Sequence, residues 1–313
     1  MRNKSTLLAK KHNTNPSKFS AMKEKFEESE LIINNDGSIF HLHLRPEQLA
    51  DKVILVGDPG RVALVASHFD SRECEVESRE FRTITGSYKG KRITVISTGI
   101  GCDNIDIVVN EIDALANIDF ETRRVKPQLK RLELVRIGTC GGLQTYTPEG
   151  TFVASIKSIG FDGLLNFYAG RDEVCDLDAE RAFTEAMGWQ GHQCIAHPYV
   201  AKAHPELIER IAGSDMVHGI TIACGGFYGP QGRELRLPLA DPEQNDKVMH
   251  FHHDGLDITN FEMESSALAG LAALIGHKAL TCCMVIANRR AGKANPNYKN
   301  SIDALITMVL DRI

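Results

Sequence analysis

The sequence lacks the features that mark several large classes of protein. Its 36 Lys and Arg residues against 41 Asp and Glu residues leave a formal net charge of -5 at pH 7, so it has no surplus of cations to neutralise a nucleic-acid backbone. No stretch approaches the ~20 apolar residues of a membrane span, and no apolar signal core follows Met1. We therefore expect neither nucleic acid nor a membrane among its partners.

The eight cysteines are scattered, and none belongs to a C-x-x-C pair. Secreted disulfide scaffolds are shorter and denser in cysteine, so we expect reduced thiols and a cytoplasmic protein. The cluster His250-Phe251-His252-His253 has no carboxylate or thiolate at the spacing of a zinc site. We expect no bound metal.

Length and composition are those of a globular protein. A chain of 313 residues with 42% hydrophobic and 25% charged residues can bury a full core as one large α/β domain or two small ones. Residues 1–38 form a polar, basic segment that we interpret as a flexible arm, the alternative being an organelle transit peptide. Within it, residues 22–30 could form an exposed helix. Residues 39–313 contain no convincing linker.

Three predicted strands end in glycine-rich segments. Residues 51–57 lead into Gly57-Asp58-Pro59-Gly60-Arg61, residues 91–97 into Thr98-Gly99-Ile100-Gly101, and residues 133–137 into Gly138-Thr139-Cys140-Gly141-Gly142. Such strand ends gather along one edge of an open α/β sheet, so Arg61, Arg136 and Thr139 could converge on an oxyanion. Free phosphate fits this cluster, since neither a Walker loop nor a dinucleotide-binding motif is present.

The remaining pattern alternates strands and helices. Alternation over residues 40–44 predicts a strand with His41 and His43 on one face. The basic insertion at residues 120–130 is a solvated loop or, less favoured, a site for an acidic partner. We further predict strands at residues 80–88, 150–159, 217–224 and 279–287, and helices at residues 62–69, 104–116, 177–187, 204–211 and 302–313.

Two further segments carry polar residues in unusual surroundings. Gly225 to Arg233 combines an aromatic ring, an amide and a guanidinium that could read the edge of a heterocycle; the alternative is a Gly/Pro loop with incidental polar residues. Glu262 and Glu264 directly precede the apolar residues 267–276, which predict a helix buried on all sides. We favour a binding site over the alternative that Asn260 caps this helix and the acids favour its positive end.

Taken together, these motifs resemble the nucleoside phosphorylases of the purine nucleoside and uridine phosphorylase superfamily, and within it most closely the uridine phosphorylases. The resemblance runs in the right order from about residue 40 to the C-terminus and includes Arg79-Glu80-Phe81. It implies one three-layer α/β/α catalytic domain with a central mixed, partly barrel-like sheet. It also implies a pentosyltransferase of pyrimidine salvage that converts uridine and phosphate to uracil and ribose 1-phosphate, without a cofactor because phosphate is the co-substrate.

The resemblance also assigns roles to residues and implies a homo-oligomer, at least a dimer, with an active site shared between subunits. Phosphate would be bound by Gly57, Arg61, Arg136 and Thr139, with Arg79 from a neighbouring subunit. The ribose would be held by Glu262, Met263 and Glu264, with His41 reaching the 5′-hydroxyl across the interface. The base would be read by Phe227, Gln231 and Arg233, and the catalytic residues would be Arg233, Gln231, Arg136 and Thr139.

Departures from the family pattern leave alternatives open. Asn288 stands where purine-specific relatives place an acid, which favours a pyrimidine. Asn104 replaces a serine of the potassium site of some members, so whether a monovalent cation binds at the interface stays open. The insertion at residues 120–130 resembles the dimeric eukaryotic type, but dimer and hexamer both remain open. The same fold could host a purine nucleoside phosphorylase or a hydrolytic nucleosidase, and a non-catalytic nucleoside-binding protein is a further alternative. Ribose versus deoxyribose and uridine versus thymidine preference are also open.

Overall fold

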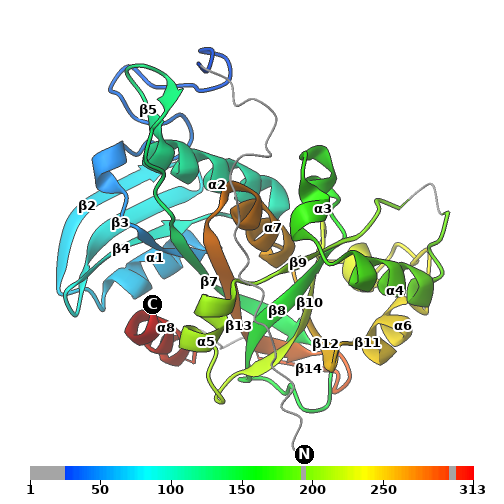
Figure 1. Ribbon diagram of the computed structural model, residues 1–313. Helices are drawn as coiled ribbons and strands as arrows, with labels where there is room; N and C mark the ends of the chain where they lie inside the picture. Colours follow the sequence, from blue (N-terminus) through cyan, green and yellow to red (C-terminus); the bar gives the residue numbers. More distant parts are fainter. Residues whose placement is uncertain (1–24, 192–194, 296–300) are drawn as a thin grey trace, which may run out of the picture.

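A mixed sheet of twelve strands runs through the protein (Figure 1). The structure is a computed structural model, and it describes residues 25–191, 195–295 and 301–313. Along the sheet the order is β11-β12-β10-β8-β13-β7-β1-β4-β3-β2, with β9 paired to β8 and β14 to β13. The strands are β1 (Lys52–Val56), β2 (Ser71–Ser78), β3 (Phe81–Tyr88), β4 (Lys91–Ser97), β7 (Glu133–Gly142), β8 (Phe152–Gly160), β9 (Tyr199–Lys202), β10 (Val217–Ala223), β11 (His252–His253), β12 (Leu256–Glu262), β13 (Lys278–Asn288) and β14 (Lys293–Ala294).

Part of this sheet closes into a ring. Strand β12 pairs with β10 in parallel and also with β7 in antiparallel fashion, so that β7, β13, β8, β10 and β12 form a barrel-like unit. The closing pairs are Asn260 with Gly142 and Phe261 with Gly141. Strand β7 therefore continues through the third glycine-rich segment, and the prediction that it ends near Ile137 is wrong. Its last residues stay in the sheet because β13 and β12 both supply partners there.

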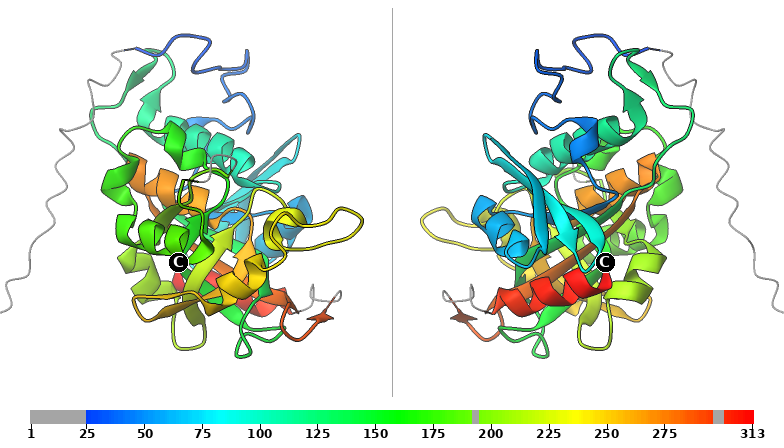
Figure 2. Two further views of the ribbon diagram at one scale, coloured as in Figure 1. Left: turned by 90° about the vertical axis from the view of Figure 1, so that its right-hand side faces the viewer. Right: turned by 90° about the vertical axis from the view of Figure 1, so that its left-hand side faces the viewer.

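Helices cover both faces of the sheet, which confirms the predicted three-layer α/β/α fold (Figure 2). On one face the apolar sides of α1 (Pro59–Ala66), α5 (Pro205–Ile211) and α8 (Ile302–Arg312) share a core with β1, β7 and β13. On the other face α2 (Cys102–Asn117) packs against α7 (Ser265–Ile275). The predicted helix buried on all sides is confirmed for most of the circumference of α7, whereas Ala273 and Ile275 are exposed.

Shorter elements complete the described chain. The hairpin of β5 (Ile118–Asp119) and β6 (Arg124–Val125) spans the start of the basic insertion. There Arg123 donates to the carbonyls of Phe26 and Glu27 at 3.0 and 3.2 Å. At least this cation therefore anchors the N-terminal segment of its own chain. The other helices are α3 (Arg171–Val174), α4 (Leu177–Met187), α6 (Gln244–His250) and the short 3-10 turns η2 (Pro46–Gln48), η3 (Leu164–Phe167) and η4 (Gly229–Gln231).

The predicted strand at residues 40–44 is wrong. These residues form a turn, in which the N–H of Ile39 bonds to the carbonyl of Leu44 at 2.8 Å and His43 has a φ of 51°. Leu42 and Leu44 are nevertheless fully buried in the core beside α2. The alternation in the sequence therefore indicates only that every second residue is buried. A turn that packs against the core can bury alternate residues as a strand does.

The N-terminal arm is described only in part. Residues 25–30 form bends and turns, so this part of the predicted helix at 22–30 is not helical, and Leu31 is buried against the α2 core. Residues 1–24 lie outside the described residues, and the division into arm and domain stays a prediction. All cysteines that the structure describes are free thiols, whereas Cys194 falls outside it. None of the described helices is long and apolar enough to cross a membrane.

Candidate functional site

Three parallel strands bring the glycine-rich segments to one edge of the sheet, as the sequence predicts. Val56 of β1 pairs with Ser97 of β4 on one side and with Ile137 of β7 on the other. Helix α1 begins directly after β1, and Arg61 in its first turn is buried with Nη1 at 3.3 Å from the carbonyl oxygen of Ile137. A guanidinium is therefore fixed beside Ile137, in the middle of β7.

A cavity of about 830 Å³ opens at this edge. Every site residue that the sequence analysis named lines it except Arg79 and His41. Residues that the analysis did not place in the site also line it. The lining residues are Gly57, Asp58, Pro59, Arg61, Glu80, Gly99, Ile100, Asn104, Arg136, Thr139, Cys140, Gly141, Phe227, Gln231, Arg233, Phe261, Glu262, Met263, Glu264, Ile286, Ala287, Ala294 and Asn295.

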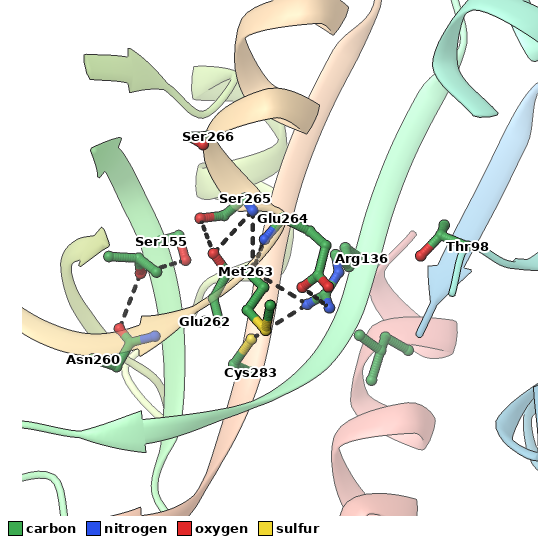
Figure 3. Close-up of polar contacts among 12 residues, drawn as sticks. Thr98, Arg136, Ser155, Asn260, Glu262, Met263, Glu264, Ser265, Ser266 and Cys283 are labelled. Carbon is green, nitrogen blue, oxygen red and sulfur yellow. Dashed lines mark hydrogen bonds and ion pairs between the residues drawn. The ribbon is translucent and has the colours of Figure 1, made fainter. Parts of the chain in front are cut away.

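Arg136 lies between two carboxylates in the wall of this cavity (Figure 3). Its Nη2 pairs with Oε2 of Glu264, and its Nη1 lies 3.5 Å from Oε2 of Glu262. The other oxygen of Glu264 accepts the N–H of Gly101 at 2.8 Å. Burial opposes the charge on Arg136, but the two carboxylates outweigh it and raise the pKa of the guanidinium. Arg136 is therefore a fixed buried cation.

Gly138 leaves the space that this guanidinium occupies. A Cβ at position 138 would lie 2.1 Å from Nη1 of Arg136 and 2.9 Å from Sγ of Cys283. Arg136 cannot move aside without breaking its ion pair with Glu264, because its whole side chain is buried. This glycine of the Gly138-Thr139-Cys140-Gly141-Gly142 segment therefore has a packing role.

Glu262 caps helix α7 from within the wall. Its two oxygens accept the N–H groups of Glu264 at 2.9 Å and of Ser265 at 2.9 and 3.0 Å, and Oε1 also accepts the Ser265 hydroxyl at 2.6 Å. Burial raises the pKa of the Glu262 carboxyl to about 7, whereas Arg136 acts in the opposite direction. Glu262 thus both caps α7 and lines the cavity.

The alternative in which Asn260 caps this helix is wrong. Asn260 lies within β12, and its side-chain oxygen accepts the hydroxyls of Thr221 at 2.9 Å and Thr259 at 2.8 Å. The strand holds Asn260 away from the start of the helix, where Glu264 is the N-cap residue and the Glu262 side chain accepts the free N–H groups.

Phe227, Gln231 and Arg233 form one connected unit. The Arg233 guanidinium lies 3.6 Å from the centroid of the Phe227 ring, and its Nη1 donates to the Phe227 carbonyl at 2.6 Å and to Oε1 of the buried Gln231 at 2.5 Å. Burial and the nearby Arg289 lower the pKa of Arg233 to about 10, so it stays charged at neutral pH. Arg289 itself donates to the Gln231 carbonyl at 2.9 Å, a support that the sequence analysis missed.

Asn288 does not face the cavity. Its buried side chain donates to the carbonyls of Gln144 at 3.0 Å and Thr147 at 2.8 Å and accepts the N–H of Ala291 at 2.9 Å. Both polar atoms of the Asn288 side chain are therefore hydrogen-bonded to main-chain groups. Other residues near Asn288 in the chain do line the cavity, namely Ile286 and Ala287 of β13 and Ala294 of β14. Strand β14 has only two residues, which are too few for a strand to be predicted from the sequence.

His41 and Arg79 lie together outside the cavity. The Arg79 guanidinium is 6.0 Å from the centroid of the Phe40 ring, which meets the His41 ring edge-on at 4.7 Å. The His41 Nδ1 bonds to Glu111 of α2 at 2.6 Å. Glu111 is a further residue that the sequence analysis missed, because it lies seventy positions from His41.

The fold and the cavity define an α/β protein with a candidate ligand site that combines buried cations and carboxylates at the carboxyl edge of a partly closed sheet. Within the described residues, no group of three or more His, Cys, Asp and Glu side chains is arranged to hold a metal ion. The chain belongs to the phosphorylase superfamily, whose family model matches residues 51–309. The family resemblance in the motifs is thereby confirmed.

Relatives of two kinds match most of the chain. A uridine phosphorylase from Thermococcus kodakarensis is 29% identical over 86% of this chain and 84% of its own length. A DeoD-type purine nucleoside phosphorylase from Roseobacter denitrificans is 26% identical over 82% of this chain and 90% of its own. A Trypanosoma brucei nucleoside phosphorylase that shows uridine phosphorylase activity has a TM-score of 0.82 at 29% identity, covering 90% of this chain and 99% of that one. These names agree with the prediction of a pentosyltransferase.

Proposed function

We propose that this protein cleaves uridine with phosphate to give uracil and ribose 1-phosphate, in the cytoplasmic salvage of pyrimidines. The observation that carries the proposal is a single cavity that holds both the buried Arg61 and Arg136 and the Gln231–Arg233 pair. The arginines suit a phosphate dianion. The amide and guanidinium suit the planar, polar edge of a pyrimidine.

The reaction follows from these charges. A phosphate oxygen held by Arg61, Arg136, Thr139 and the N–H groups near Gly57 forms a bond to C1′ of the nucleoside. The C1′–N1 bond breaks, and its electron pair moves onto the departing base. Donors that are already in place for this developing anion stabilise the transition state more than the ground state, so neither a covalent nucleophile nor a cofactor is required.

The ribose is assigned to Glu262, Met263 and Glu264. Glu264 lies in the wall with Arg136 as its partner, so its carboxylate can accept ribose hydroxyls while the arginine faces phosphate. Holding both reactants in one orientation supplies much of the rate enhancement of such a reaction.

The carboxylates of the cavity support a pyrimidine rather than a purine. Those that line it are Asp58, Glu80, Glu262 and Glu264, and none belongs to the Phe227–Arg233 unit or to β13. A purine leaving group needs a proton donor, and the candidate position carries Asn288, whose side chain binds main-chain groups. A hydrolase on this fold would have no use for Arg61 and Arg136 together.

The active site is shared between subunits in this proposal. His41 and Arg79 lie near one another yet outside the cavity of their own chain, as expected of residues that complete a neighbour's site in a dimer or larger homo-oligomer. Mixing the variants R79A and R233A, each of which we expect to be impaired, tests this, because a mixed oligomer regains one site with both wild-type residues. We expect activity to rise after subunit exchange; a mixture no more active than its components would contradict the shared site.

A substrate panel tests the proposed reaction. Uridine, thymidine, inosine and adenosine are each incubated with and without phosphate, and base release is followed by chromatography. We expect phosphate-dependent release of uracil from uridine and little release from the purine nucleosides. Phosphate-independent release would favour a nucleosidase, faster cleavage of inosine a purine nucleoside phosphorylase, and binding of uridine without cleavage a nucleoside-binding protein.

A further inference from the structure

The segment at residues 228–233 contains the side chains of Gln231 and Arg233, and its own main chain is held by other parts of the protein. Three consecutive carbonyl groups, those of Pro230, Gln231 and Gly232, each accept at least one hydrogen bond from a side chain of another element. Every one of these bonds is lost if the segment moves. Together they fix the direction in which Gln231 and Arg233 point.

Helix α6 supplies donors to all three carbonyl groups. Nε2 of Gln244 donates to the Pro230 carbonyl at 2.9 Å. Nδ2 of Asn245 donates to the Gly232 carbonyl at 3.3 Å and to the Gln231 carbonyl at 3.5 Å. The first two residues of one helix therefore hold the main chain of the segment.

Two further donors come from the ends of sheet strands. Sγ of Cys224, directly after β10, donates to the Pro230 carbonyl at 3.5 Å, and Nη2 of Arg289, directly after β13, donates to the Gln231 carbonyl at 2.9 Å. Within the described residues, however, the Gly232 carbonyl has a side-chain donor only in Asn245. The sheet alone therefore does not fix the end of the segment that leads into Arg233.

Asn245 also fits the backbone conformation at Gly232. Gly232 has a φ of 63°, in the left-handed region that favours glycine. A Cβ at this position would lie 2.4 Å from Nδ2 and 2.5 Å from Oδ1 of Asn245. The amide therefore packs directly on the glycine, and a larger residue at position 232 would separate α6 from the segment.

Helix α6 is itself anchored to the sheet. Its Val248 is buried in a core that it shares with Ile258 of β12 (Figure 1), and its Lys247 pairs with Asp241 at 2.8 Å. The helix cannot move away from the segment without exposing Val248 to water. Its two donors therefore hold the segment against a fixed support.

We propose that Gln244 and Asn245 are positioning residues, which fix the segment at residues 228–233 so that Arg233 meets the negative charge on the departing base. The inference rests on the proposed function and gives a role to α6, none of whose residues lines the cavity. A charged donor stabilises the transition state only where it is aligned, and a displacement of about 1 Å can cost roughly a hundredfold in rate.

The double variant Q244A/N245A tests this role. We expect kcat for uridine to fall about tenfold with an unchanged KM for phosphate, because Arg61 and Arg136 belong to other elements. The variant D246A truncates the next, exposed residue of the same helix and should behave as wild type. An unchanged kcat in the double variant would overturn the inference. N245D keeps the size of the side chain and exchanges its donor for an acceptor, so it should show the same pattern even if the double variant folds poorly.

Comparing uridine with 5-fluorouridine separates positioning from a general structural role. Fluorine withdraws electron density, so the departing base is a more stable anion and depends less on Arg233. The double variant should therefore lose about tenfold on uridine but at most about threefold on 5-fluorouridine. Equal losses on both nucleosides would mean that α6 only supports the fold, and would overturn the positioning role.

A double-mutant cycle with R233A provides a second measurement. If α6 acts through Arg233, adding Q244A/N245A to R233A should lower kcat by less than about threefold, because the residue that they position is already absent. A further loss of about tenfold would show that α6 acts independently of Arg233 and would overturn the inference.

These outcomes separate the inference from the reaction on which it rests. Phosphate-dependent cleavage of uridine with equal losses on the two nucleosides overturns the role of Gln244 and Asn245 and leaves the proposed function standing. A wild-type protein that cleaves neither nucleoside overturns the proposed function itself.

Discussion

Replacing Arg233 with alanine removes the cation that we place against the departing base. In the structure this guanidinium stacks on Phe227 at 3.6 Å and donates to Oε1 of Gln231 at 2.5 Å. The change therefore deletes one charged donor and also releases the amide that the donor orients. A preorganised donor to a developing anion contributes about 3 kcal/mol, which corresponds to a loss of roughly a hundredfold in kcat.

The loss should fall on the chemical step and not on phosphate binding, because Arg61 and Arg136 belong to other elements. The variant R233K retains a charge but loses the planar fork and the stacking, so an intermediate rate is expected. Arg236, exposed in the loop that follows, provides the matched control R236A, which should retain wild-type turnover.

Steady-state phosphorolysis of uridine measures these rates, with kcat and the KM for each substrate determined separately. Near wild-type turnover in R233A would refute the assignment of Arg233 to the leaving base. Equal losses in R233A and R236A would show a general effect of removing charge from this loop.

Three further predictions concern the cavity wall and the opposite edge of the sheet. In E264Q, calorimetric titration should show nucleoside binding weakened about tenfold or more, because the amide no longer offers a charged acceptor to the ribose hydroxyls. Phosphate binding should be retained, because Arg136 keeps Glu262 as a carboxylate partner; equal loss of both would count against a ribose role. In G138A the added methyl group would lie 2.1 Å from Nη1 of Arg136, so phosphate KM should rise at least tenfold with an unchanged circular dichroism spectrum, and an unaltered KM would contradict the packing argument. Burial opposes the charge on Glu133, but hydrogen bonds from a neighbouring arginine and lysine outweigh it and lower the pKa from 4.5 to about 2, so its stabilising effect is present above pH 4.5 and lost as the pH falls towards 2. Urea titrations of E133Q should therefore show lower stability at neutral pH and a shallower loss in acid, and a wild-type acid profile would disprove this contribution.

Much of the site could be predicted because its parts are local in the sequence. A short β-branched strand that ends in glycine is recognisable without knowledge of its neighbours, and parallel strands must end at the same edge. The segments around Gly57, Thr98 and Gly138 accordingly lie side by side. The buried run after Glu264 was recognisable for the same reason, since an apolar helix without a polar face must be covered.

What could not be predicted depends on partners that are distant in the chain. The turn at residues 40–44 has the alternation of a strand, and it is Glu111, on a helix seventy positions away, that accepts its N–H groups. Likewise β7 continues through Gly141 and Gly142 because β12 and β13 pair with it there. The side chain that caps α7 is Glu262 and not the predicted Asn260, because Asn260 lies within β12, which extends to Glu262. In each case tertiary pairing decided between local alternatives of similar propensity.

The most direct test of the proposed reaction is to follow uridine and phosphate with the purified protein by phosphorus-31 NMR while uracil is measured by absorbance. The account predicts that a ribose 1-phosphate resonance grows at the rate at which uracil appears, with one phosphate consumed for each uracil released. Uracil formed without loss of phosphate, or a uridine signal that stays unchanged in the presence of both substrates, would contradict it.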